Sequence, residues 1–62
     1  MKAEDFLNVS KHKAHDLAEA NSFIFRLVSV DGEVILGYPE DIRTDRICVE
    51  IKSNRVIAAT IQ

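Results

Sequence analysis

The segment of residues 37–46 constrains the fold more than any other part of the chain. It contains the only proline, one of the two glycines and five charged residues. Proline removes a backbone donor and glycine packs poorly on a pleated surface, so the segment is predicted to be a loop. Apolar runs at 23–28 and 47–51 lie on either side of it. Two strands joined by a long charged loop are therefore expected, and such loops often carry function.

Length and composition favour one small globular domain over residues 1–62. A chain of 62 residues has room for one core, and it buries only about 60% of the surface that the unfolded form exposes. The formal net charge of −2 gives no basic excess to neutralise phosphates, so nucleic acid is not an expected partner. No apolar run is long enough to span a membrane. The single cysteine and the absence of an apolar leader at the N-terminus predict a cytoplasmic protein.

Residues 3–20 show the periodicity of a helix. Apolar and small residues recur there at spacings of three and four, at Ala3, Phe6, Leu7, Ser10, Ala14, Leu17 and Ala18. Ser10 is a good N-cap, so a short turn followed by a helix over 11–20 is predicted. Asn21 and Ser22 compete for backbone hydrogen bonds and end it. One continuous helix over 3–20 is the alternative.

Residues 23–30 are rich in β-branched and aromatic side chains and are predicted to form the first strand. Phe23, Phe25 and Leu27 face one way, and Arg26 makes the other face partly polar. Asp31 and Gly32 form a turn. Residues 33–36 then either pair back as a hairpin strand or form the rising arm of the loop.

Residues 47–52 alternate between two faces, with Ile47, Val49 and Ile51 on one and Cys48 on the other. After a turn at 53–54, residues 55–61 form a final edge strand, with Val56 and Ala58 counted inward. The predicted fold is α+β: one helix packed on a small mixed sheet, with an extended exposed loop.

No set of residues predicts an enzyme, a metal site or a cofactor. His12 and His15 share one side of the helix but lack a clear third ligand, which is typical of a solvated face. Cys48 has no base beside it in the sequence and is expected to be a small, semi-buried hydrophobic residue. The loop carboxylates are expected to be solvated or paired with arginines; they are Glu33, Glu40, Asp41 and Asp45.

Residues 43–49, with the sequence Arg-Thr-Asp-Arg-Ile-Cys-Val, resemble a segment of the potato-inhibitor-I-type serine-protease inhibitors. In those proteins and in the related small bacterial peptidase-inhibitor family, an Arg-x-Asp-Arg-apolar-x-apolar segment follows the reactive loop. The likeness extends over 7–61, through Ala14 and Leu17 in the helix, the strand at 24–30, and the turn and strand at 54–57. The resemblance implies a wedge in which a helix backs a small sheet and a rigid loop enters a protease cleft.

The resemblance also implies which residues would form the site. The partner-binding loop would consist of Leu36, Gly37, Tyr38, Pro39, Glu40, Asp41 and Ile42. The bracing residues would be Arg43, Asp45 and Arg46, while Cys48 stands where a second arginine brace is expected. Counting back from Arg43, the residue before the bond that a protease would cleave is Glu40. Counting forward from Gly32, that residue is Gly37. Neither residue suits the apolar pocket of a chymotrypsin- or subtilisin-like enzyme.

Two functions are therefore expected. The first is a non-enzymatic module that presents residues 36–42 to a protein partner, which the resemblance implies to be a serine protease. Tyr38, an aromatic residue on a proline-stiffened loop, would be an anchor. The second is a structural protein that forms a homodimer or larger homo-oligomer through a sheet edge or a helix face. In that case the ion pairs of the loop would only order it.

Overall fold

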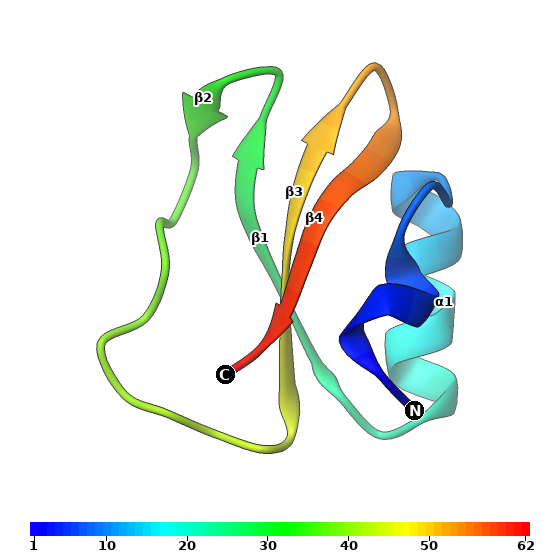
Figure 1. The fold of residues 1–62 in the computed structure, drawn as a ribbon, viewed down its shortest axis with the longest axis vertical. Coiled ribbons are helices and arrows are strands. Elements are labelled where there is room, and N and C mark those ends of the chain that lie inside the picture. The colour runs from blue at the N-terminus through cyan, green and yellow to red at the C-terminus, as the bar shows by residue number, and fades with distance from the viewer.

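The computed structural model describes residues 1–62 and places one α-helix against a four-stranded mixed sheet, which confirms the predicted α+β class. The strands are β1 (Ile24–Val30), β2 (Glu33–Val34), β3 (Arg46–Lys52) and β4 (Arg55–Ile61), in the order β2-β1-β3-β4. The central pair, β1 and β3, is parallel, and the two outer pairs are antiparallel. The helix α1 (Lys11–Ala20) lies on one side of the strands, and the loop between β2 and β3 swings out on the other (Figure 1).

The N-terminal part divides into two helical pieces, as the preferred interpretation predicted. A 3-10 helix over Ala3–Phe6 comes first, and α1 begins after Ser10, whose hydroxyl accepts from the Lys13 amide at 3.2 Å. The alternative of one continuous helix is wrong because Asn8 has a φ of 65°, a left-handed conformation that asparagine tolerates and helices do not. Asn8 instead donates to the Val56 backbone oxygen at 2.9 Å, which ties this segment to the edge of β4.

The strand β1 places Phe25 and Leu27 against the core, as its alternation predicted. Its register with β3 shifts between Leu27 and Ser29, so Val28 is an extra residue in a β-bulge. The backbone oxygen of Val28 accepts from the Ile35 amide at 2.8 Å. The bulge turns Ser29 to the face opposite α1, where the loop lies.

Both expectations for residues 33–36 describe part of the structure. Glu33 and Val34 form the short strand β2, which pairs with β1 through a tight turn at Asp31 and Gly32. Both turn residues have positive φ, as a two-residue hairpin of this kind requires. Ile35 and Leu36 then leave the sheet as the arm of the loop.

The core lies between β3, β4 and the helices. Its buried members come from both helical segments and the two strands: Phe6, Ala14, Ala18, Ile47, Val49, Ile51 and Val56. Cys48, expected to be semi-buried, is 0% exposed because the other face of β3 is covered as well.

Of the two β4 residues predicted to face the core, Val56 does so, but the prediction for Ala58 is wrong. A second register shift, between Glu50 and Ile51, makes Ile57 an extra residue and leaves its side chain exposed. Ala59 and Ile61 pack against the core instead.

The helices are too short and too polar to cross a membrane.

Candidate functional site

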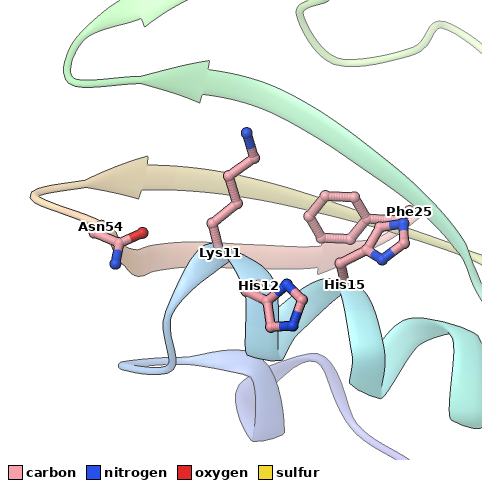
Figure 2. Close-up of a pocket in the computed structure, with 5 residues that line it drawn as sticks. All are labelled: Lys11, His12, His15, Phe25 and Asn54. Carbon is pink, nitrogen blue, oxygen red and sulfur yellow. The ribbon is translucent and has the colours of Figure 1, made fainter.

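The two histidines of α1 line an open hollow beside the sheet. Figure 2 shows Lys11, His12 and His15 from α1 facing Phe25 and Asn54. The His15 ring meets the Phe25 ring edge-on, with centroids 5.3 Å apart. Each histidine is paired through Nε2 with the carboxylate one turn later, since His12 lies 3.3 Å from Asp16 and His15 lies 3.5 Å from Glu19. Nowhere do three histidine, cysteine or acidic side chains gather as metal ligands would.

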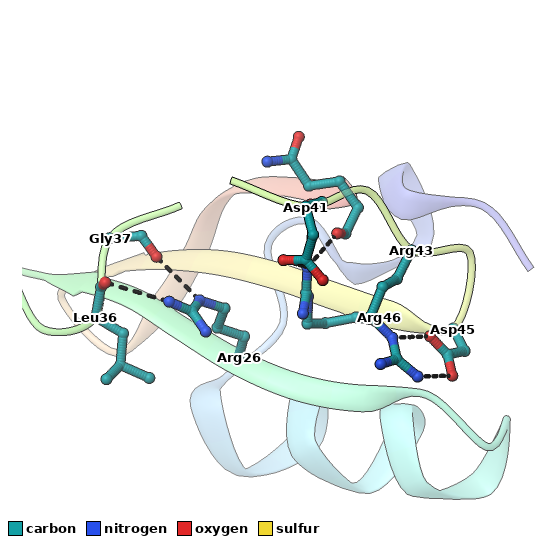
Figure 3. Close-up of polar contacts among 8 residues, drawn as sticks. Arg26, Leu36, Gly37, Asp41, Arg43, Asp45 and Arg46 are labelled. Carbon is teal, nitrogen blue, oxygen red and sulfur yellow. Dashed lines mark hydrogen bonds and ion pairs between the residues drawn. The ribbon is translucent and has the colours of Figure 1, made fainter. Parts of the chain in front are cut away.

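The loop between β2 and β3 is a stronger candidate, because side chains of the sheet hold it at three places. The first is at its start, where Arg26 reaches out from β1 (Figure 3). Its Nε donates to the Gly37 oxygen at 3.0 Å, and its Nη2 donates to the Leu36 oxygen at 3.3 Å. Gly37 has a φ of 72°, a backbone conformation that suits glycine. Sequence reasoning missed this role of Arg26, although the residue is the only charged one within an apolar strand.

The second tether joins Tyr38 to the middle of the sheet. Its hydroxyl donates a hydrogen bond to one oxygen of Glu50 on β3. The other Glu50 oxygen accepts from the Ser29 hydroxyl at 3.2 Å. Tyr38 is predicted to be an anchor for a partner. In the structure its hydroxyl is turned toward the sheet, and the residue is 46% exposed.

This tether is expected to be sensitive to alkali. The hydrogen bond to Glu50, with smaller effects from burial and from the charge of Glu50, raises the pKa of Tyr38 to about 12 from 10.0. Because the folded pKa is the higher one, the stabilisation is complete below pH 10 and is lost as the pH rises toward 12. Tyr38 is the only tyrosine and the chain has no tryptophan, so phenolate absorbance reports this group alone.

A spectrophotometric titration checks that expectation directly. The midpoint should lie near pH 12 in the folded protein and near 10 in denaturant. In Glu50→Gln the folded midpoint should fall toward 10, because the negative acceptor is gone. A native midpoint that already equals the denatured one would show that the hydrogen bond does not form.

We expect Tyr38→Phe to lower the free energy of unfolding by about 1 kcal/mol at neutral pH.

The third tether is Arg46, at the start of β3 and only 9% exposed. Its Nη2 donates to the Asp41 backbone oxygen at 3.3 Å and to Asp41 Oδ1 at 3.1 Å. The same nitrogen donates to the Gln62 oxygen at 2.6 Å, which joins the loop to the end of β4. The hydrogen bond from Arg46 lowers the pKa of the Asp41 carboxyl, so the pair persists until the pH falls below the ordinary value of 3.8. Arg46 therefore joins the loop at Asp41 to the start of β3 and the end of β4.

Arg43 and Asp45 act differently from the expected braces. Their side chains pair with each other through a fork, with Arg43 Nε 2.7 Å and Nη2 2.8 Å from the two Asp45 oxygens. Neither side chain forms a hydrogen bond or an ion pair with residues 36–42, and Figure 3 shows the two side chains joined to each other. Their backbones do contribute, because the Arg43 amide donates to Gln62 and the Asp45 oxygen accepts from Ile24. The second brace therefore comes from Arg26 on β1.

We call residues 36–42 the docking loop. It carries two of the most exposed large apolar side chains in the chain, since Leu36 is 60% and Ile42 is 87% exposed. Glu40 is exposed as well and takes part in no hydrogen bond or ion pair. The arrangement offers apolar side chains to the solvent while the backbone behind them is fixed.

Comparison of the chain with protein-family models, with curated proteins and with solved structures found no match.

Proposed function

We propose that the protein is a non-enzymatic binding module that presents the docking loop to a protein partner, and that this partner is a serine protease. One observation supports the proposal above the others: three side chains of the sheet hold the loop from behind, by way of Arg26, Glu50 and Arg46. The outward side of the same loop carries exposed apolar side chains. The resemblance of residues 43–49 to protease inhibitors gives the class of partner.

The physical advantage of such tethers is pre-organisation. Ordering a flexible loop on binding costs free energy, and a loop that already has its bound shape avoids that cost. Exposed apolar side chains gathered on one segment are typical of an interaction surface. A cleft that accepts an extended segment would bury these side chains without rearranging the loop.

The proposal is tested by inhibition assays with four purified proteases of different specificity: elastase, subtilisin, trypsin and a glutamyl endopeptidase. We expect the wild-type protein to inhibit at least one of them. Arg26→Met should weaken that inhibition about tenfold, because two hydrogen bonds to the loop are lost. The matched control is Arg55→Met, which removes an exposed arginine at the start of β4 and should change nothing.

A thermal unfolding curve of each variant shows whether the domain is still folded in these assays. Absence of inhibition of all four enzymes by folded wild-type protein would contradict a protease as the partner. Equal inhibition by wild type and Arg26→Met would contradict the role of the tethers.

A second candidate function, self-association through a sheet edge, is favoured by the open side of β4. This strand pairs with β3 on one side, and on its other side only Val56 exchanges backbone hydrogen bonds, with Asn8 and Val9. The part of that edge after Val56 is free to pair with a second copy. Sedimentation at micromolar concentrations tests this candidate: a dimer that Ile57→Lys dissociates would support it, and a monomer would count against it.

We place the protein in the cytoplasm, which remains a proposal. Cys48 is buried and unpaired, which suits a reducing compartment.

A further inference from the structure

We infer that Ile42 is the anchor of the docking loop, and that the partner receives it in an apolar pocket with a cationic group beside it for Glu40. This inference rests on the proposed function and names the chemistry of the partner. It differs from the two alignments with the inhibitor family, which place Glu40 or Gly37 at the centre of the site.

The first argument is that Ile42 is both exposed and fixed. It is 87% exposed, more than any other large apolar residue in the chain. The peptide units on both sides of it are held, because the Asp41 oxygen accepts from Arg46 at 3.3 Å and the Arg43 amide donates to Gln62 at 3.1 Å. A β-branched side chain also has few rotamers to lose. A rigid apolar side chain of this kind is what fills a pocket at the centre of an interface.

The second argument is the distribution of charge around Ile42. The neighbouring carboxylates of Asp41 and Asp45 are already paired with Arg46 and Arg43. Glu40, two residues before Ile42, is exposed and unpaired. The free charge beside the anchor is therefore negative, and a partner complementary to it places a lysine, arginine or protonated histidine there.

A second copy of this chain fits that description poorly. Its one hollow has Phe25 as the only apolar lining residue, whereas a branched aliphatic side chain needs apolar walls around it. Lys11 on its rim would attract Glu40, but Asp16 and Glu19, which pair with the two histidines there, would repel it. Two copies also carry the same net charge of −2. The occupant is therefore a different protein.

The test measures inhibition constants for the same four enzymes with three variants. Ile42→Ala removes the anchor, Glu40→Gln removes the free charge, and Ile57→Ala is the matched control, an exposed isoleucine on β4 outside the loop. We expect inhibition of elastase or subtilisin, whose pockets are apolar, and a loss of about 30-fold or more in Ile42→Ala. Glu40→Gln should lose less than about tenfold and should reduce the salt dependence. Ile57→Ala should behave as the wild type.

Each other outcome overturns a defined part of this inference. Unchanged inhibition in Ile42→Ala, or inhibition of the glutamyl endopeptidase that Glu40→Gln abolishes, overturns the anchor while the proposed function stands. Absence of any inhibition by the wild type overturns the proposed function and the anchor with it. Self-association that Ile42→Ala abolishes in sedimentation overturns the choice of partner. Because Ile42 is exposed, its replacement should leave thermal unfolding unchanged, so loss of folding does not confuse the assay.

Discussion

Replacing Arg46 by methionine is expected to release the docking loop. Methionine keeps much of the apolar stem but removes three hydrogen bonds that join Asp41 and Gln62 to β3. The Arg46 side chain is almost wholly buried, so its hydrogen bonds should together contribute about 1–3 kcal/mol. Hydrogen exchange of the Arg43 amide, which donates to Gln62, should accelerate by about tenfold or more.

The control for this experiment is Arg43→Met. Arg43 is exposed and its side chain pairs only with Asp45, so we expect little change in the free energy of unfolding and little effect on exchange. The Arg43 amide itself is present in both variants, which makes the comparison direct. Equal acceleration in the two variants would show that Arg46 has no special role in holding the loop.

Replacing Phe6 by alanine is expected to have the largest effect on stability. Phe6 comes from the short 3-10 helix, yet it is 0% exposed and lies in the core with its ring edge-on to Phe23 at 6.2 Å. Removing a fully buried phenylalanine ring costs about 3–5 kcal/mol. A chain of 62 residues has little stability to lose. Denaturant unfolding followed by circular dichroism should therefore show a variant that is at most marginally folded.

Leu7→Ala provides the matched control, since Leu7 is the next residue but 40% exposed. We expect it to lose about 1 kcal/mol or less. If Phe6→Ala were as stable as Leu7→Ala, the N-terminal segment would not be part of the core, and the pairing of Asn8 and Val9 with Val56 would also be in doubt.

The parts of the fold that local patterns determine were predictable from the sequence. The helix over 11–20 follows from the Ser10 cap and the periodic apolar residues, and both are present in the structure. The alternation of Ile47, Val49 and Ile51 identified the central strand and its core face. These predictions succeed because hydrogen bonds and burial within one element depend on neighbours in the sequence.

The tethers of the loop depend on register, which sequence patterns do not specify. Arg26 holds the loop because β1 lies between β2 and β3, the strands that the loop connects. Ser29 meets Glu50 only because a bulge at Val28 shifts the pairing. The exposure of Ile57 follows from the second register shift in the same way. An extra residue in a strand moves every later side chain to the opposite face of the sheet. No local sequence pattern indicated either register shift.

The parallel pairing of β1 and β3 has a consequence for how the loop can vary. The connection between these strands contains no helix, and the tethers hold it at Leu36, Tyr38 and Asp41. Residues inserted between Tyr38 and Asp41 would leave every tether in place, and doubling the length of a flexible connection costs only about 0.6 kcal/mol. The same scaffold should therefore accept longer or altered sequences at the tip, which makes this position suitable for grafting foreign peptide segments.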